Sequence, residues 1–364
     1  MPLLQTTVSS LAVLLAVWTA FTLASAVVGV AANAVIQRLP DPTTQYRRFY
    51  GAILFPLAVV AFVALVEVTF PFVMSGAIIT EPPGIVVTIA VAYLEMLAAG
   101  GVYLAGYAPT IRGLRAVRDI EYSTATAVRD MARFIAGLCV PFALIFAGII
   151  AGASTVTLIA GIAIALLGLY IASPWFITLT RDTRPPDPET AERIDTLADR
   201  VGLDVRDVRL FQTADVKTAT ATVRGVSGYR RLFLDELFLD VYDDDTAVAL
   251  LAIQAGSVRA RAILRKVAPW LLVLLSLLGP LLGGPLWLLL LLPVAPLAWL
   301  WLVPRGVRVA DDYAARQVGA DAVADAMVAS AEYHDIDPPR HSLPKKWLFG
   351  PGLGDRIERL RARE

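Results

Sequence analysis

Few side chains in this sequence of 364 residues could act as a metal ligand or a general base. The only two histidines, His334 and His341, stand seven positions apart with Pro338-Pro339 between them. They therefore do not share one helix face at the spacing of two metal ligands. A surface loop is the simpler interpretation, and a metal site there would also need Asp335 or Asp337 as a ligand.

Two acidic residues, Glu67 and Glu95, lie inside long apolar segments. An ionised carboxylate is costly in a bilayer and usually faces a polar partner or the interior of a helix bundle. These residues could form an intramembrane polar site, such as an ion pathway or a contact for a bound peptide. Because no Lys, Arg or His accompanies them in those segments, two carboxyl groups that hold neighbouring helices together are the favoured interpretation.

The composition is that of a membrane protein, with 57% apolar residues, 18% charged residues and a mean hydropathy of +0.64. About 20 apolar residues in a helix cross the roughly 30 Å of hydrocarbon in a bilayer. The uncharged or nearly uncharged segments predict about seven spans, five followed by two. Segments 11–36, 51–79 and 83–111 give one span each, and 134–180 gives two because Ala151-Gly152-Ala153-Ser154 divides it. Segment 267–304 is divided at Gly283-Gly284-Pro285 into a hairpin of two short helices.

The short loops predict the orientation, since Lys and Arg concentrate on the cytoplasmic side. Loop 38–49 carries three Arg and loop 112–133 carries five, whereas the connections at 80–82 and 152–155 carry no basic residue. We therefore expect a multi-pass protein of the cell membrane with its N-terminus outside, its first span retained, and its large polar regions in the cytoplasm.

The predicted organisation has four parts. Residues 1–180 form a membrane domain of five spans. Residues 181–266 and 305–364 together form a cytoplasmic domain of about 145 residues, an ordinary size for one domain. The two-span hairpin, 267–304, interrupts that domain.

The charge balance and residue usage limit the partners. A net charge of zero argues against a nucleic-acid partner and leaves the lipid bilayer as the expected one. The one cysteine, Cys139, cannot form an internal disulfide. Only four of the 32 basic residues are Lys, so 28 are Arg, and Asp is frequent; this haloarchaeal-like composition indicates a prokaryote with a GC-rich genome.

Apolar periodicity predicts a mixture of helices and short strands in the polar regions. A helix over 192–201 ends at Gly202, and strands follow near 205–211 and 232–234. Further helices are expected at 244–266, leading straight into the hairpin, and after it at 307–318, 322–330 and 355–363.

This order of elements resembles the HtpX-like family of membrane zinc metallopeptidases, over roughly residues 189–363. Leu251-Ala252-x-x-x-Gly256-x-Val258 is similar to the family's L-A-H-E-x-G-H-V. Residues 310–315 (ADDYAA) are similar to its E-x-x-A-D-x-Y-A-A, and 351–360 (PGLGDRIERL) to its H-P-x-x-x-x-R-I-x-x-L. The resemblance implies a mainly α, polytopic membrane protein with a small α+β metallopeptidase-like cytoplasmic domain.

The sequence departs from the family at the positions that carry chemistry. Two helical histidines would bind zinc and a glutamate would activate a zinc-bound water. Ile253 and Ser257 stand at the histidine positions and Gln254 at the glutamate. Val307 stands at the third ligand, while Asp311 matches a residue that supports the ligands in the family.

Minor departures are Gly350 at a family histidine and Thr218-Ala219 at an Asn-Ala motif beside the substrate. Aliphatic side chains offer a metal no lone pair, a neutral Ser is a poor zinc ligand, and an amide does not accept a proton from water. The sequence therefore predicts no zinc, no cofactor and no catalytic residues at this site.

The leading hypothesis is a catalytically degenerate, HtpX-like pseudopeptidase that serves as a binding or regulatory module. Membrane proteins, unfolded polypeptides or an active relative would be its partners. Two alternatives stay open: an active membrane metalloendopeptidase with a non-standard site, and a transporter that uses Glu67 and Glu95.

Overall fold

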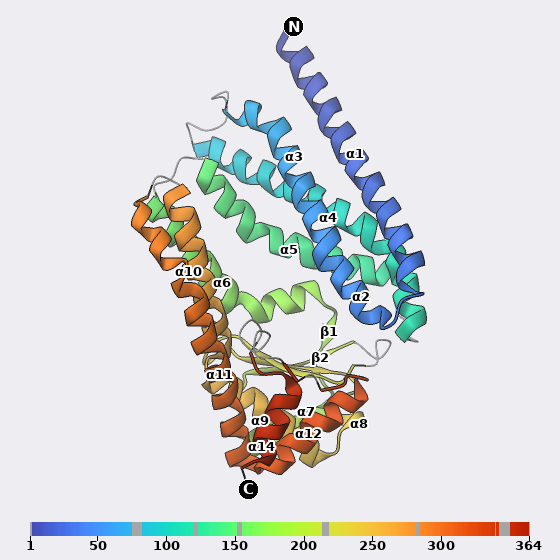
Figure 1. Cartoon of the computed structure of the whole chain (residues 1–364), viewed down its shortest axis with the longest axis vertical. Helices are drawn as coiled ribbons and strands as arrows, with labels where there is room; N and C mark the ends of the chain where they lie inside the picture. The colour runs from blue at the N-terminus through green and yellow to red at the C-terminus, as the bar shows by residue number, and fades with distance from the viewer. Residues whose placement is uncertain are drawn as a thin grey trace. The chain divides into compact units, whose positions relative to one another are not determined.

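The computed structural model describes residues 2–74, 82–118, 123–150, 155–212, 218–281, 284–338, 340–341 and 350–363 (Figure 1). The expected breaks at 151–154 and at Gly283 lie outside the described residues. The chain forms two compact units: residues 1–165 with 179–181, and residues 166–178 with 182–364.

Every regular element among the described residues of the first unit is a helix. Its elements are α1 (Pro2–Ile36), α2 (Pro42–Phe49), the π-helical turn η1 (Tyr50–Leu54), α3 (Phe55–Met74), α4 (Pro82–Arg118), α5 (Thr124–Ile150) and the first part of α6 (Thr155–Thr180).

Helix α4 contacts α1, α3 and α5, and small residues permit its closest crossing. A Cβ atom on Gly29 of α1 would lie 2.2 Å from the carbonyl oxygen of Gly106 of α4. Such close approach of small residues is a common way for helices to associate in lipid, where burial of apolar surface gives little driving force.

The predicted number of spans agrees with the structure. Six helical segments among the described residues are long and apolar enough to cross a membrane, and the bent pair α9–α10 supplies a seventh when it is taken as one span. Five of the seven end by Thr180, and the bent pair and Leu286–Val318 come later in the chain. The uncharged runs in the sequence are long enough to predict these helices directly.

The second unit contains a four-stranded sheet in the order β1-β2-β4-β3. Strand β2 is parallel to β4, and both sheet edges, β1 and β3, are antiparallel to their neighbours. The strands are β1 (Thr183–Arg184), β2 (Asp207–Phe211), β3 (Ala221–Arg224) and β4 (Arg231–Asp235). The expected strands near 205–211 and 232–234 are confirmed, whereas β1 and β3 were not expected.

The helices that pack with the sheet enclose one apolar core, to which Ile194, Leu232, Leu251, Val323 and Leu360 contribute fully buried side chains. In Figure 1, α7, α9, α12 and α14 are drawn on the same side of the sheet. The helices of this unit are α7 (Pro188–Arg200), α8 (Phe238–Val241), α9 (Asp244–Arg259), α10 (Ala262–Leu281), the 3₁₀ helix η3 (Leu286–Leu291), α11 (Val294–Val318), α12 (Ala320–Tyr333) and α14 (Leu353–Arg361).

The prediction of a single helix over 244–266 is wrong. Helix α9 ends at Arg259 and α10 begins at Ala262, with a bend of 43° between them. Arg261 has a φ of 49°, which lies in the left-handed region and breaks the helical hydrogen-bond ladder.

The sequence also predicted that the second short helix of the hairpin ends before a separate helix at 307–318, and this prediction is wrong. Helix α11 runs without interruption from Val294 to Val318, with Pro304 inside it. The second hairpin span and the helix that carries Asp311 are therefore one continuous helix.

Candidate functional site

Helix α9 carries the positions at which the sequence suggested a lost metal site, and its start is well anchored. The Asp243 carboxylate accepts a hydrogen bond from the backbone N–H of Thr246 at 2.8 Å. Hydrogen bonds from the hydroxyl and the backbone of Thr246 lower the pKa of Asp243. Arg193 and Arg200 of α7 form ion pairs with Asp244 and Asp245 in the first turn. These contacts fix α9 from its N-terminal end.

Helix α9 crosses α11 closely at Gly256. A Cβ atom there would lie 2.2 Å from the carbonyl oxygen of Ala310, so only glycine fits without moving a helix. Four residues earlier on α11, a Cβ on Gly306 would lie 3.9 Å from the Cα of Ala262, at the start of α10. The stretch of α11 that carries Val307 therefore lies near the start of α10.

The four altered positions have different surroundings. Ile253 packs against the apolar core of the unit, whereas Gln254 and Ser257 line a pocket. Val307 is half-buried on α11 and is not among the residues that line this pocket. Within the part of the chain that the structure describes, no group of three His, Cys, Asp or Glu side chains is placed to hold a metal ion.

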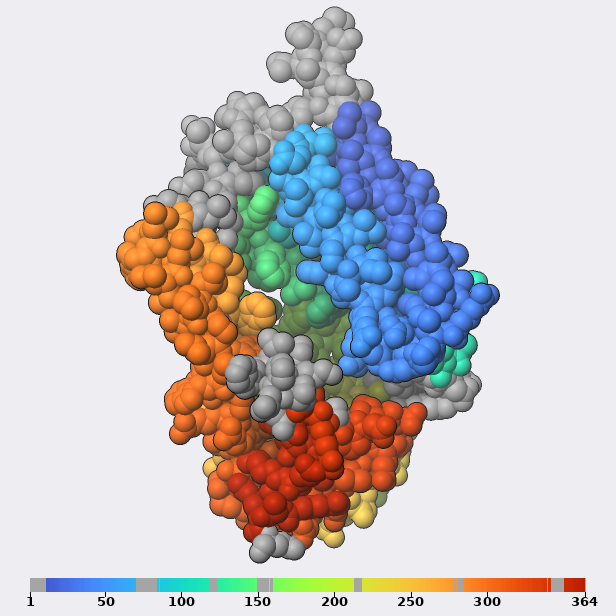
Figure 2. Space-filling view, viewed as in Figure 1, coloured from blue at the N-terminus to red at the C-terminus, as the bar shows by residue number. Residues whose placement is uncertain are grey.

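Asp311 links α11 to α14. Its buried carboxylate accepts hydrogen bonds from Arg356 at 2.6 Å and from Arg359 at 2.7 Å. The neighbouring Asp312 accepts from Arg359 at 3.0 Å and from Arg363 at 2.6 Å. Figure 2 shows the red surface of α14 beside the orange-red surface of α12, with which it is in contact.

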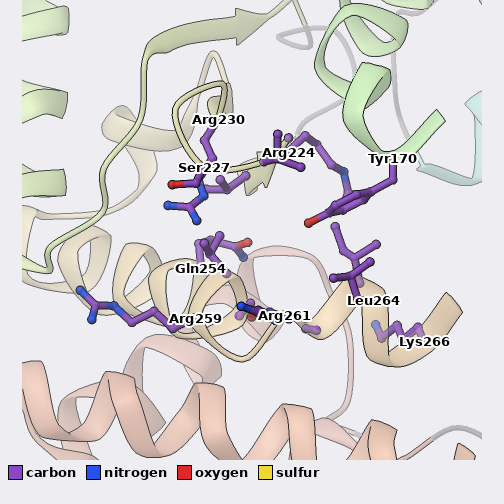
Figure 3. Close-up of a pocket in the computed structure, with 16 residues that line it drawn as sticks. Tyr170, Arg224, Ser227, Arg230, Gln254, Arg259, Arg261, Leu264 and Lys266 are labelled. Carbon is purple, nitrogen blue, oxygen red and sulfur yellow. The ribbon is translucent and has the colours of Figure 1, made fainter. Parts of the chain in front are cut away.

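The pocket beside Gln254 and Ser257 has a volume of about 480 Å³ and lies within the second unit (Figure 3). Its wall consists of the end of α9 and the start of α10, the strand β3 with the turn that follows it, and one residue of α6. Five of the lining residues are cationic and none of the described lining residues is acidic: Arg224, Arg230, Arg259, Arg261 and Lys266.

Figure 3 shows how the polar side chains are arranged around this pocket. Arg230 and Ser227, from the turn between β3 and β4, lie across from Gln254 of α9. Arg224, on β3, lies beside Tyr170 of α6. Burial of the Arg224 guanidinium lowers its pKa from the usual value. No hydrogen bond of Gln254 is found among the described residues, which leaves its amide facing the pocket.

The turn between β3 and β4 is held against α6. The Arg231 guanidinium lies 5.6 Å from the centre of the Trp175 ring, and the Trp175 and Tyr229 rings are 6.3 Å apart. A Cβ on Gly225, whose φ is 99°, would lie 2.9 Å from Pro174. These contacts explain why residues 166–178 of α6 belong to the second unit.

The histidines take part in local contacts with the protein chain. His334 Nε2 accepts a hydrogen bond from the backbone N–H of Ala219 at 3.4 Å, while its Nδ1 lies 2.6 Å from the Ser330 carbonyl. The backbone N–H of His341 donates to Asp355 at 3.1 Å, and His341 Nδ1 lies 2.9 Å from the Gly350 carbonyl. The Thr218-Ala219 segment thus leads into β3 and is tied to α12.

The two intramembrane acids lie in different environments. Glu95 of α4 is buried and accepts a hydrogen bond from the Thr69 hydroxyl of α3, so it connects two helices. Glu67 of α3 is exposed at the surface of the first unit. The two carboxyl groups therefore do not share one buried environment.

Sequence reasoning missed the cationic lining of the pocket. Its residues come from segments up to 96 positions apart, from Tyr170 to Lys266, which no local pattern connects. A usable signal for β3 was present: Thr220-Ala221-Thr222-Val223 is rich in β-branched residues, and Gly225 and Gly228 follow before Leu232-Phe233-Leu234. That pattern indicates a hairpin that would bring Arg224 and Arg230 together.

No family model and no curated protein matches this sequence. Among solved structures, the chain is similar to the crystal structure of S. mikatae Ste24p, with a TM-score of 0.60 and 15% sequence identity. The match covers 94% of the present chain and 98% of the Ste24p chain, so it includes the membrane helices as well as the polar unit. The chain therefore has the mainly helical, multi-pass fold of that structure, with a small sheet in its polar part.

Proposed function

We propose that this protein is a catalytically degenerate, HtpX-like member of the membrane metallopeptidase fold that binds ligands or clients without hydrolysing them. The observation that carries the proposal is the close crossing of α9 and α11 at Gly256 and Ala310. This crossing joins the two helices on which Ile253, Gln254, Ser257 and Val307 occupy the positions of the expected ligands and base.

The residues present do not fit a zinc ion. Zinc in peptidases is held by imidazole, thiolate or carboxylate groups, and water activation needs a base that can accept its proton. Two aliphatic side chains, one hydroxyl and one neutral amide supply neither a ligand set nor a base. Ile253 also packs into the apolar core, where a metal ligand would have to turn outward.

The contacts around the site support a binding module rather than a former active site whose pocket has closed. Asp311 and Asp312 still connect α11 to α14, and Asp243 still caps α9. The pocket beside Gln254 stays open at about 480 Å³ and has polar side chains in its wall. Membrane proteins, unfolded polypeptides or an active relative are the clients that we propose for the module.

Metal analysis of the full-length protein tests this proposal directly. We expect purified protein to contain no stoichiometric zinc and to leave casein uncleaved, with or without a chelator. The matched gain-of-function variant carries Ile253→His, Gln254→Glu, Ser257→His and Val307→Glu, and we expect it to bind zinc because the ligands return to a peptidase frame.

Two results would contradict the proposal. One is stoichiometric zinc in the wild-type protein, and the other is chelator-sensitive casein cleavage, which would favour the active metalloendopeptidase. Failure of the four-residue variant to bind zinc while it remains folded would show that these positions do not form one site.

A further inference from the structure

The pocket beside Gln254 has an unbalanced charge. Arg224, Arg230, Arg259, Arg261 and Lys266 line it, and none of the described residues in its wall is acidic. Like charges gathered around a small volume repel one another, and this repulsion is relieved when an anion enters. We call this feature the cationic pocket.

Other arginines in the same unit are neutralised by nearby carboxylates. Arg231 pairs with Asp207, Arg193 pairs with Asp244, and Arg356 pairs with the buried Asp311. By contrast, none of the described residues forms an ion pair with Arg224, although burial lowers the pKa of its guanidinium. A desolvated cation without a protein anion is a candidate ligand contact.

One of the five cations is already engaged. The Arg259 guanidinium lies 4.6 Å from the centre of the Tyr313 ring, and Figure 3 shows it pointing away from Arg230. Four cations are then left for a ligand: Arg224 and Arg230 from the β3 side, and Arg261 and Lys266 from the α9–α10 junction.

Neutral groups complete the wall of the cationic pocket. Ser227 and Ser257 offer hydroxyl groups, and Gln254 and Tyr170 offer an amide and a phenol. The first turn of the 20-residue helix α10 also lines the pocket, and the N-terminal end of a helix favours negative charge. A phosphate group has several oxygens and more than one negative charge, so it suits this many donors better than a single carboxylate does.

We propose that the cationic pocket binds a phosphate-bearing anion, with Arg224, Arg230 and Lys266 as its main contacts. This inference deepens the proposed function and rests on it, because it names what the non-hydrolytic module holds. The phosphate could belong to a phospholipid headgroup or to a soluble phosphate.

The surroundings of the cationic pocket make a headgroup accessible. Lys266 is the last charged residue before the uncharged segment 267–304, and Leu264 beside it is exposed. Tyr170 and the exposed Trp175 lie on α6, a candidate span, and aromatic residues are common at the lipid–water boundary. Basic pockets between membrane helices bind anionic headgroups in the same way.

The test compares the full-length wild-type protein with the double variant R230Q/K266Q. Both substitutions remove the positive charge and keep a polar side chain, and both positions lie outside the apolar core. The matched control is Arg316→Gln, which removes one positive charge at an exposed position of α11 outside the pocket. Arg230→Lys, which keeps the charge, is the conservative variant.

Native mass spectrometry from mixed micelles of phosphatidylglycerol and phosphatidylcholine reports lipid retention, and calorimetry with inorganic phosphate reports the soluble source. We expect wild-type protein and R316Q to retain phosphatidylglycerol selectively, and R230Q/K266Q to bind it about tenfold more weakly or worse. Arg230→Lys should retain most of the binding. Binding of inorganic phosphate without lipid selectivity would assign the site to a soluble ligand.

The proposal is overturned if R230Q/K266Q binds both probes as the wild-type protein does, or if wild-type protein binds neither. Zinc content, measured on the same samples, separates this failure from that of the proposed function. Zinc-free protein that binds no anion contradicts only the cationic pocket, whereas zinc-loaded, hydrolytic protein contradicts the pseudopeptidase.

Discussion

Asp311 is fully buried, and its charge is matched by Arg356 and Arg359 of α14. Taking a carboxylate out of water costs several kcal/mol, which only close and well-oriented cations offset. The resemblance assigned this position a supporting role beside metal ligands, but its contacts here are with another helix. A residue of this kind stabilises the fold whether or not the protein performs any chemistry.

We expect Asp311→Ala to lower the free energy of unfolding by about 3 kcal/mol, because two guanidinium groups lose their buried partner. The matched control is Asp325→Ala, since Asp325 pairs with Arg361 of the same α14 but is 68% exposed. That change should cost less than about 1 kcal/mol. Thermal unfolding in detergent, followed by circular dichroism, measures both, and equal effects would contradict the assigned role.

At the scale of elements, the crossing of α9 and α11 sets the geometry of the site. Gly256 lies against the backbone of Ala310, and Tyr313, one turn further along α11, donates a hydrogen bond to the Val201 carbonyl at 2.8 Å. The two helices are thus fixed to each other and to the end of α7. Small movements at this crossing would change the wall of the cationic pocket.

Gly256→Ala should separate α9 from α11 and lower the free energy of unfolding by roughly 1–3 kcal/mol, as overpacking does in tight interiors. Gly168→Ala in α6 is the control, because its added Cβ meets nothing within 4 Å. That variant should unfold at or slightly above the wild-type temperature, since Ala favours helix more than Gly does. A melting temperature of Gly256→Ala equal to that of wild type would show that the crossing is not tight.

The sequence predicted the elements that long, local patterns determine. Uncharged runs such as 267–304 indicate spans directly, and α7 follows from apolar periodicity that ends at Gly202. The bend at Arg261 could not be predicted, because a positive φ at an arginine depends on tertiary contacts. The cationic pocket was also missed, since Arg224 and Lys266 are brought together only by the fold.

At the scale of the whole molecule, the distribution of charge over the loops predicts how the protein is oriented in the membrane. Loops 38–49 and 112–133 are rich in Arg, and an even number of spans separates the polar segments 181–266 and 305–364. From the positive-inside rule we predict that the polar unit lies in the cytoplasm and the N-terminus outside.

Single cysteines test this orientation after Cys139 is replaced by Ala, two of them at the exposed positions Arg47 and Arg316. Cysteines at Arg47 and Arg316 should resist a membrane-impermeant maleimide in intact cells and react after the cells are opened. A cysteine at Gln5, before the first span, should react in intact cells. Labelling of Arg316→Cys in intact cells would reverse the assigned topology.

The two spans of the hairpin differ in how they continue into the polar unit. Helix α11 is one rod of 25 residues, about 37 Å at the usual rise of 1.5 Å per residue, and it continues unbroken to Asp311 and beyond. Helix α10 instead joins α9 through the bend at Ala260 and Arg261, and Arg261 lines the cationic pocket. A thinner bilayer increases the tilt of membrane spans, and here the added tilt would be taken up at that bend rather than in α11. The pocket would then respond to the thickness of the surrounding lipid, which makes its affinity for an anion depend on acyl-chain length.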